Sequence, residues 1–248
     1  MKSKEKKPNL KIILVEPNGP INVGSIARLC ANFKVDQLRI VSPRCDIYSI
    51  EAKKMALRGI SYIDDSRIFE NISDAIADCD LVLASCGRSD IKTEFRKVPL
   101  ENISQWIRKF KNLNNVAIIF GREDRGLTNK ELLMAHKVFN IPTNINYQSL
   151  NLSHAVSIVL YEFNKDTSYK QNNEKLNFDI ANSKEIEESF SDIEKLLLKA
   201  GYLQPHTANA KISKFKKFIL NAQTTSHEIN VLRGIVNQIN WAIKNIRE

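Results

Sequence analysis

Residues 120–128 read Phe-Gly-Arg-Glu-Asp-Arg-Gly-Leu-Thr and follow directly on an apolar run at 116–119. A short, continuous apolar run predicts a strand that is buried on both faces. Thr128 and Glu131 have the spacing of a capping box, so a helix is expected to begin there. Ligands of open α/β sheets bind at the carboxyl ends of the strands, where this loop lies. An ordinary turn with solvated charges is the alternative, but the chain has only 8 glycines in 248 residues and places two of them here.

Strand-like and helix-like segments alternate through residues 1–163. We predict strands at 12–15, 38–41, 81–84, 116–120 and 138–141, and helices at 22–33, 72–77 and 152–163. This alternation predicts an α/β fold, in which a mostly parallel sheet is built through right-handed crossovers and carries helices on both faces. Residues 164–183 are rich in Asn, Lys, Asp and Ser, which predicts a polar linker. Residues 184–248 carry three amphipathic patterns and are expected to form a small helical extension.

The charge of the chain and the spacing of its cysteines and histidines limit its chemistry. A net charge of +9 favours an anionic partner. Residues 205–248 hold seven Lys or Arg against two Glu, which fits either an RNA-docking surface or simply solvated helices. No apolar stretch is long enough to cross a membrane, and the N-terminus lacks the apolar region of a signal peptide. The four cysteines and four histidines show no CxxC or HExxH spacing, so we expect no metal site, and scattered thiols suit a reducing cytoplasm.

Two further segments place polar side chains at a predicted helix start. Residues 22–28 read Asn-Val-Gly-Ser-Ile-Ala-Arg, so that Asn22 can cap a helix and Arg28 lies nearly two turns further on. Residues 141–152 read Ile-Pro-Thr-Asn-Ile-Asn-Tyr-Gln-Ser-Leu-Asn-Leu and precede the last helix of the first domain. Each segment alone fits an ordinary helix start. No GxGxxG follows the first strand and no GxxxxGK[ST] occurs, which argues against a Rossmann dinucleotide site and a P-loop.

Three segments of the chain resemble, in order, the three motifs of the SPOUT superfamily of RNA methyltransferases. They are NxGxxxR at 22–28, FGREDRGLTN at 120–129 and IPTNxxYxSLNLxxAV at 141–156. The resemblance is strongest to the SpoU/TrmH branch, which methylates ribose 2′-hydroxyls with S-adenosyl-L-methionine. Within that branch, FGREDRGLTN and the helical extension containing residues 228–235 resemble the TrmJ-type tRNA (cytidine/uridine-2′-O)-methyltransferases. The resemblance implies a C-terminal trefoil knot in a catalytic domain at 1–163, a homodimer formed through the knot-side helices, and tRNA docking by residues 184–248. It also implies that the target is pyrimidine 32 of the anticodon loop.

The resemblance also assigns roles to individual residues of this chain. It implies catalytic roles for Arg28, Asn22 and Glu123. The residues that it implies for the S-adenosylmethionine site are Ser85, Cys86, Gly87, Gly121, Ile141, Ser149, Leu150 and Asn151. The chain departs from the usual family pattern after the third predicted strand, where it reads Ser-Cys-Gly-Arg at 85–88, at Gln148, and at Lys216–Lys217 in place of an arginine pair. These departures leave the implied chemistry in place and leave the position of the target nucleotide open.

The implied role of Arg28 needs a physical reinterpretation. A guanidinium with a pKa above about 12 is a poor general base. We therefore expect Arg28 to act as a cationic clamp that gathers a phosphate and stabilises developing negative charge on the attacking oxygen. Three alternatives to the leading interpretation stay open. They are the same chemistry on ribosomal RNA or at another tRNA position, a non-catalytic RNA-binding protein with the same fold, and a metabolic α/β enzyme.

Overall fold

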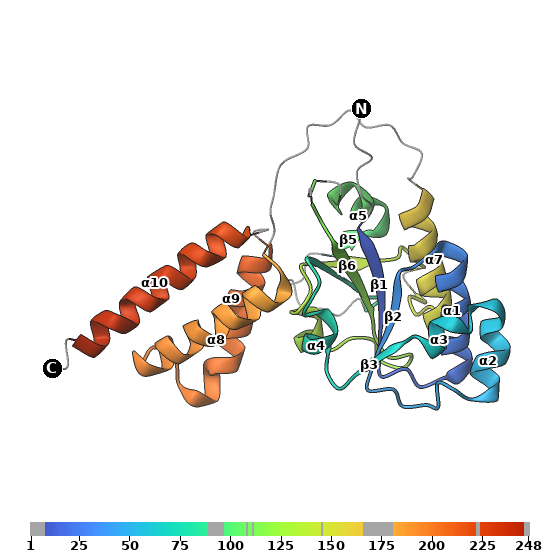
Figure 1. The fold of residues 1–248 in the computed structure, drawn as a ribbon, viewed down its shortest axis with the longest axis horizontal. Coiled ribbons are helices and arrows are strands. Elements are labelled where there is room, and N and C mark those ends of the chain that lie inside the picture. The colour runs from blue at the N-terminus through green and yellow to red at the C-terminus, as the bar shows by residue number, and fades with distance from the viewer. Residues whose placement is uncertain are drawn as a thin grey trace.

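A single seven-stranded sheet forms the centre of the molecule (Figure 1). The computed structural model describes residues 8–88, 97–107, 109–110, 112–144, 146–165, 181–221 and 224–245. The strands are β1 (Asn9–Val15), β2 (Gln37–Val41), β3 (Arg67–Phe69), β4 (Leu81–Ser85), β5 (Val98–Pro99), β6 (Asn115–Phe120) and β7 (Lys137–Asn140). Their order is β3-β2-β1-β6-β4-β7-β5, and every pair of neighbours is parallel. The prediction of a mostly parallel α/β sheet is confirmed.

Side chains of the central strands alternate between two buried cores. In β1, Ile12 and Leu14 pack into one cluster, while Ile13 and Val15 pack into the other. All four are at most 2% exposed. This arrangement explains why the strands read as continuous apolar runs, because both faces of a parallel sheet are covered. Burying one such side chain contributes about 1.5–3 kcal/mol, so the central strands form the most stable part of the fold.

Helices cover both faces of the sheet, as Figure 1 shows. The helices of the first domain are α1 (Pro20–Phe33), α2 (Ile50–Ala56), the 3-10 helix η1 (Leu57–Gly59), α3 (Ser61–Asp64), α4 (Ile72–Ile76), α5 (Leu100–Ile107), α6 (Asn129–Leu132) and α7 (Leu152–Lys165). Helices α1, α2, α3, α5 and α7 contribute to the larger core cluster, and α4 and α6 to the smaller one on the other face. The five predicted strands and the predicted helices are confirmed to within two residues, except that β1 begins three residues earlier, at Asn9. The knot stays a prediction.

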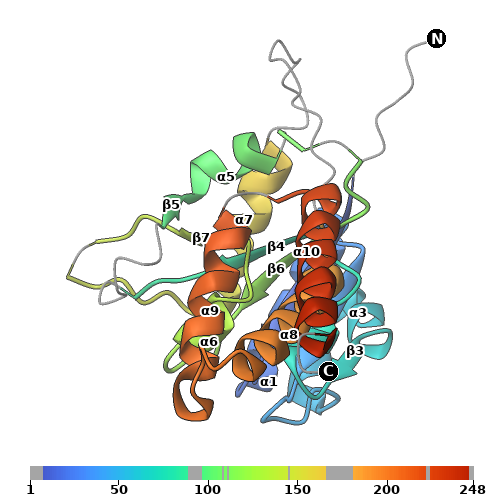
Figure 2. The same cartoon turned by 90° about the vertical axis from the view of Figure 1, so that its left-hand side faces the viewer.

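Three long helices form a separate module beside the sheet (Figures 1 and 2). They are α8 (Ser183–Lys199), α9 (Pro205–Asn221) and α10 (Ser226–Asn245). Their apolar faces share one core cluster that includes Phe190. The ring of Phe190 meets the ring of the more exposed Phe215 edge to face, with centroids 5.3 Å apart. Helix α8 begins at a capping box made by Asn182 and Glu185, and the predicted capping box of Thr225 and Glu228 opens α10. The predicted helical extension is therefore confirmed.

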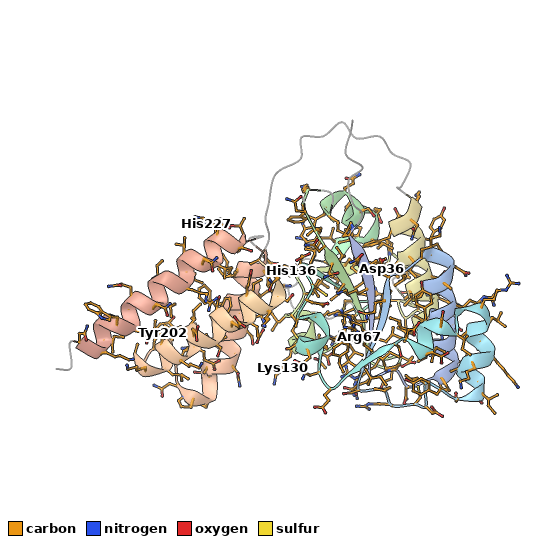
Figure 3. The ribbon with its side chains drawn as sticks, viewed as in Figure 1. Asp36, Arg67, Lys130, His136, Tyr202 and His227 are labelled. Atoms are coloured by element: carbon orange, nitrogen blue, oxygen red, sulfur yellow. The ribbon has the colours of Figure 1, made fainter. Side chains whose placement is uncertain are left out.

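The module is anchored to the ends at which two central strands begin. The Ser183 backbone N–H donates to the Cys79 carbonyl at 3.2 Å, just ahead of β4. Lys217 of α9 is buried and donates to the Ala135 carbonyl at 3.1 Å, ahead of β7. His136 lies beside it, between the sheet and the module (Figure 3). Burial, and then the nearby Lys217 charge, lower the pKa of His136 to about 4.

The predicted linker at 164–183 falls mostly outside the described residues, because 166–180 belong to none of the described ranges. At its ends, α7 extends through Lys165 and the buried Ala181 precedes the cap of α8. The division of the chain at this linker stays a prediction. Within the described ranges, no helix combines the length and the apolar composition that crossing a membrane requires.

Candidate functional site

A cavity of about 510 Å³ opens where β4 and β6 end and where the segment after β7 passes over them. Its lining residues are Ser85, Gly87, Arg88, Phe120, Gly121, Arg122, Glu123, Asp124, Arg125, Gly126, Ile141, Gln148, Ser149, Leu150, Leu152 and Ala155. The site thus lies at the carboxyl ends of parallel strands, where the sequence predicted a ligand. Six residues of the predicted cofactor set are among those that line it: Ser85, Gly87, Gly121, Ile141, Ser149 and Leu150.

The loop at 120–128 depends on its two glycines for different reasons. A Cβ atom on Gly121 would lie 2.2 Å from the carbonyl carbon of Gly126 and 2.3 Å from the Leu127 nitrogen. No side chain fits there, because backbone atoms cannot move aside. Gly126 has φ +66°, a conformation that glycine adopts without steric cost. Its N–H donates to the Arg122 carbonyl at 3.0 Å, which closes the loop into a tight turn.

The buried side chain of Arg122 fixes this loop through ion pairs with two glutamates. Arg122 is 8% exposed and binds Glu131 through both terminal nitrogens, at 2.9 and 3.0 Å, and also pairs with Glu16 at the end of β1. Hydrogen bonding to Arg122 lowers the pKa of Glu16. Burial raises the pKa of Glu131, but hydrogen bonds from Arg122 and Thr128 outweigh it and leave that pKa below its ordinary value. Glu131 also completes the predicted capping box with Thr128.

A chain of hydrogen bonds joins the three sequence motifs. The Asn22 amide donates to Glu123 Oε1 at 3.1 Å, and the Asn151 amide donates to Asn22 Oδ1 at 3.0 Å. Glu123 also accepts the backbone N–H groups of Asn18 at 3.0 Å and Gly19 at 3.2 Å. Residues more than 100 positions apart are thus fixed side by side next to the cavity. The structure brings Asn22, Glu123 and Asn151 together, as the motif reading implied.

Asn22 does not cap its helix, contrary to the expectation from sequence. Helix α1 begins two residues earlier, at Pro20, with Gly19 at the N-cap and no side-chain cap. Proline suits the first helical position because its missing N–H would have no partner there. The amide of Asn22 is consequently available to Glu123. Asn151, in contrast, does act as a local cap, because its Oδ1 accepts the Ser153 N–H at 2.8 Å.

Four predicted site residues are absent from the cavity lining. Asn22 and Asn151 are connected to it by hydrogen bonds through Glu123, whereas Arg28 and Cys86 lie apart from it. Arg28 is exposed on α1, about 9 Å along the helix axis from Asn22 and on a different face. Among the described residues, none forms a hydrogen bond or ion pair with its side chain. Cys86 is 4% exposed and packs into the smaller core cluster, while its N–H donates to the Phe139 carbonyl at 2.9 Å.

Two arginines that the sequence analysis left without a role prove to organise the site. One is Arg122. The other is Arg88, directly after β4, which donates to the Leu127 carbonyl at 2.8 Å and to Asn129 Oδ1 at 3.0 Å. Arg88 thus ties the end of β4 to the 120–128 loop across the cavity. The only sequence signal for Arg122 was its place between a buried strand and a capping box that holds Glu131.

Nothing in the described ranges resembles a metal centre, since no group of three or more His, Cys, Asp or Glu side chains is placed to hold an ion. All four cysteines are free thiols. Burial raises the pKa of Cys79 to about 12, which keeps that thiol protonated and unreactive at neutral pH. The polar side chains that line the cavity include the Gln148 amide, the carboxylates of Glu123 and Asp124, and the guanidinium groups of Arg88, Arg122 and Arg125.

These features define an α/β protein with a cavity at the carboxyl ends of its central strands, beside three sequence motifs that side-chain hydrogen bonds join. Residues 9–161 match the SpoU rRNA Methylase family, and residues 184–248 match the C-terminal domain of the tRNA methyltransferase TrmJ. Because the first match alone covers more than half of the sequence, the chain belongs to the SpoU methylase family.

Known relatives agree with this assignment. The chain is 41% identical over 154 residues to the tRNA (cytidine-2′-O-)-methyltransferase TrmJ of Sulfolobus acidocaldarius, a match that covers 62% of this chain and 64% of that protein. It is 30% identical over 242 residues to the tRNA (cytidine/uridine-2′-O-)-methyltransferase TrmJ of Photorhabdus laumondii, covering 95% of this chain and 99% of that one. The crystal structure of TrmJ from Z. mobilis ZM4 superposes with a TM-score of 0.81 at 29% identity, covering 95% of this chain and 100% of the other.

Proposed function

We propose that this protein transfers a methyl group from S-adenosylmethionine to a ribose 2′-hydroxyl of tRNA, at pyrimidine 32 of the anticodon loop. One observation supports this proposal above others. The Glu123–Asn22–Asn151 hydrogen-bond chain joins the three motif segments at the rim of a cavity large enough for a small ligand. The family and the full-length TrmJ relatives, which act on cytidine and uridine of tRNA, support the choice of substrate.

The cavity fits the methyl donor in size and in chemistry. At about 510 Å³ it lies within the range of drug-sized ligand pockets. Ile141, Leu150 and Leu152 offer apolar surface to an adenine ring, while Ser85 and Gln148 offer polar groups to a ribose or an amino acid. When bound, S-adenosylmethionine supplies an electrophilic methyl group for the ribose oxygen. The protein supplies the position of that oxygen and its electrostatic surroundings.

Glu123 acts in this proposal as a support for the active centre. It already accepts three hydrogen bonds, from Asn18, Gly19 and Asn22, of the roughly four that a carboxylate can accept. The charge of Glu123 thus holds the start of α1 against the 120–128 loop. Asn22 is thereby oriented by two hydrogen bonds, since its amide nitrogen donates to Glu123 and its amide oxygen accepts from Asn151. The amide pair provides a fixed polar rim for the ribose.

Arg28 provides the positive charge on the RNA side of the site. Arg28 is exposed and its side chain forms no hydrogen bond or ion pair with the described residues, which suits a group that meets the phosphate of the target nucleotide. A permanently charged guanidinium group stabilises the ribose 2′-oxygen as that oxygen gains negative charge, and the proton of the 2′-hydroxyl passes to water. Arg28→Lys should therefore retain part of the activity, whereas Arg28→Ala should retain almost none.

The C-terminal module is proposed to add tRNA affinity through exposed basic residues such as Lys211 and Lys244. Its two adjacent lysines serve another purpose, because Lys216 pairs with Glu187 and Lys217 is buried against the first domain. They therefore do not replace the arginine pair of the family as RNA contacts.

A homodimer is also proposed, formed through the outer surfaces of α1 and α7. Ile21 on α1 and Ile158 and Tyr161 on α7 are large apolar residues with 53%, 39% and 59% of their surface exposed. Contact with a second subunit would remove this apolar surface from water. Sedimentation at several protein concentrations tests this assembly, and a monomer at all of them would contradict it.

Incubation with S-adenosylmethionine and unmodified tRNA, followed by nucleoside mass spectrometry and fragment mapping, tests the proposed function. We expect a 2′-O-methylated pyrimidine at position 32, and no product with Arg28→Ala. Methylation at another position or only of ribosomal RNA would correct the substrate. Calorimetric titration with the donor separates the remaining alternative, because a non-catalytic RNA-binding protein would not bind it. Equal inactivity of Arg28→Lys and Arg28→Ala from about pH 7 to 9 would contradict the charge model.

A further inference from the structure

Three arginines converge on Glu16 beside the cavity. Buried Arg122 pairs with Oε1 of this carboxylate. On the other oxygen, Oε2, Arg44 forms a second ion pair and the Nη2 atom of Arg125 lies 3.7 Å away. The side chain of Glu16 is 19% exposed and that of Arg122 is 7% exposed, whereas those of Arg44 and Arg125 are each 51% exposed. Two half-exposed guanidinium groups are thus held above one shielded carboxylate.

The backbone fixes both groups. The Arg44 N–H donates to the Pro17 carbonyl at 3.0 Å, in the segment whose next two residues bind Glu123. Arg125 lies within the turn that the Gly126 N–H closes, and its side chain lines the cavity. Arg125 therefore lies at the cavity, two residues from Glu123, and Arg44 lies beside Arg125 because both approach the same oxygen of Glu16.

The charges at this cluster are not balanced at its surface. Glu16 and Glu131 carry two negative charges against the three positive charges of Arg44, Arg122 and Arg125, and Arg122 in the interior pairs with both glutamates. Asp124 is the neighbour of Arg125 in sequence, but its Oδ2 atom is 4.0 Å from Arg125 Nη1 and its side chain is 66% exposed. A solvated pair at that distance contributes about 0–1 kcal/mol. The outer guanidinium groups consequently retain most of their capacity to bind an anion.

A phosphodiester group matches this arrangement, because its two non-bridging oxygens each accept hydrogen bonds from a guanidinium fork. We propose that Arg44 and Arg125 form a phosphate clamp, held in place by Glu16, that binds the RNA backbone next to the methylated nucleotide. This inference rests on the proposed function. It gives Arg125, in the loop that the sequence singled out, a role in positioning the substrate at the cavity.

A purely structural role predicts something different. Half-exposed ion pairs add little stability, so removing Arg44 or Arg125 should leave the fold and the donor cavity almost unchanged. Removing a phosphate contact should instead weaken RNA binding and make it less sensitive to salt. For single-stranded nucleic acid, each lost contact lowers the slope of log Kd against log salt by about 0.7, and for a duplex by about 0.9.

The test compares Arg44→Gln, Arg125→Gln and the double variant with Arg67→Gln in the full chain. Arg67 is exposed at the start of edge strand β3, away from the cavity (Figure 3). Fluorescence anisotropy with unmodified tRNA gives Kd over a range of salt, and calorimetry gives the Kd for the donor. We expect each single variant to raise the tRNA Kd several-fold and to lower the salt slope by the amount that corresponds to about one lost phosphate contact. The double variant should lower the slope by the amount for about two lost contacts. Donor affinity and the Arg67→Gln slope should match wild type.

Two results would overturn the clamp. One is a salt slope in the Arg44 and Arg125 variants equal to that of Arg67→Gln. The other is a loss of donor affinity that parallels the loss of tRNA affinity, which would mean that the pair only supports the loop. Arg44→Lys and Arg125→Lys should restore the slope, because they keep the charge. Wild-type methylation of tRNA is measured in the same preparation, so that a failure of the proposed function is distinguishable from a failure of the clamp alone.

Discussion

Replacing Arg122 by alanine should be among the most damaging single substitutions in the first domain. The change removes a guanidinium that is 7% exposed and leaves two carboxylates, Glu16 and Glu131, at 19% and 15% exposure. Breaking a buried ion pair by removing one partner costs about 3–5 kcal/mol, because the other charge stays in a poorly solvated place. Domains of ordinary stability have only about 5–15 kcal/mol in total, so the loss is readily measured.

The assay is urea unfolding followed by circular dichroism, from about pH 4 to 7, together with calorimetric titration of the donor. Both glutamates have pKa values lowered below 4.5 in the folded protein. Their contribution to stability is therefore complete above the unfolded pKa and is lost as pH falls through the folded one. In Arg122→Ala, Glu131 loses the cation that it binds and Glu16 keeps only the half-exposed Arg44 and Arg125. The deficit relative to wild type should therefore be largest at pH 7 and shrink toward pH 4.

A second variant keeps the prediction testable if Arg122→Ala does not fold. Arg122→Lys keeps the positive charge but replaces the two-pronged fork, so it should fold with a smaller deficit and weaker donor binding. A loss below about 1 kcal/mol in Arg122→Ala, or a deficit that does not change with pH, would refute the reasoning.

Three further predictions follow from single contacts. Gly121→Ala should destabilise the fold by about 1–3 kcal/mol and abolish donor binding, because the new Cβ would lie 2.2 Å from backbone. Gly87→Ala, whose Cβ would have its nearest protein neighbour at 3.5 Å, should leave the stability of the fold unchanged. Burial lowers the pKa of Lys217 to about 8 from 10.5, so wild-type stability should rise by up to about 3 kcal/mol as pH rises through that interval. Lys217→Met should show no such rise. Asn22→Ala should lower kcat by about 10–100-fold and leave donor affinity unchanged, since Asn22 does not line the cavity.

Each of these predictions can fail independently. Equal effects of the two glycine substitutions would remove the steric argument. A wild-type stability curve that is flat from pH 8 to about 10.5 would show that Lys217 releases its proton no more easily in the folded state. A fall in donor affinity in Asn22→Ala, in step with kcat, would make Asn22 part of the donor pocket instead of the catalytic rim.

The central strands could be predicted from the sequence because they are buried on both faces. The two shortest strands could not be predicted. Strand β3 has three residues and β5 has two, too few to show a pattern. Helix α2 was missed for a different reason. It buries Ala52 and Ala56, while its largest apolar residue, Ile50, is 72% exposed. A Cβ on Gly24 would lie 2.1 Å from the Ala52 carbonyl oxygen, so α1 and α2 pack through small residues that carry no periodic signal.

The candidate site was predictable only where a motif spans a few residues. The glycines and the capping box of the 120–128 loop act locally, and both were anticipated. The partner of Arg122 lies 106 residues away, at the end of the neighbouring strand β1, and parallel pairing alone brings them together. Asn22 was misjudged as a cap because the proline two residues before it provides the helix start. Long-range ion pairs of this kind leave no spacing rule in a single sequence.

The helical module and the donor cavity lie at opposite ends of the same strand. Ser183 is bonded just ahead of β4, and Ser85 at the far end of β4 lines the cavity. Five strand residues extend about 16 Å, and the contact surfaces lie beyond both ends. An RNA that touches the module and the cavity of one chain must therefore reach around the edge of the sheet.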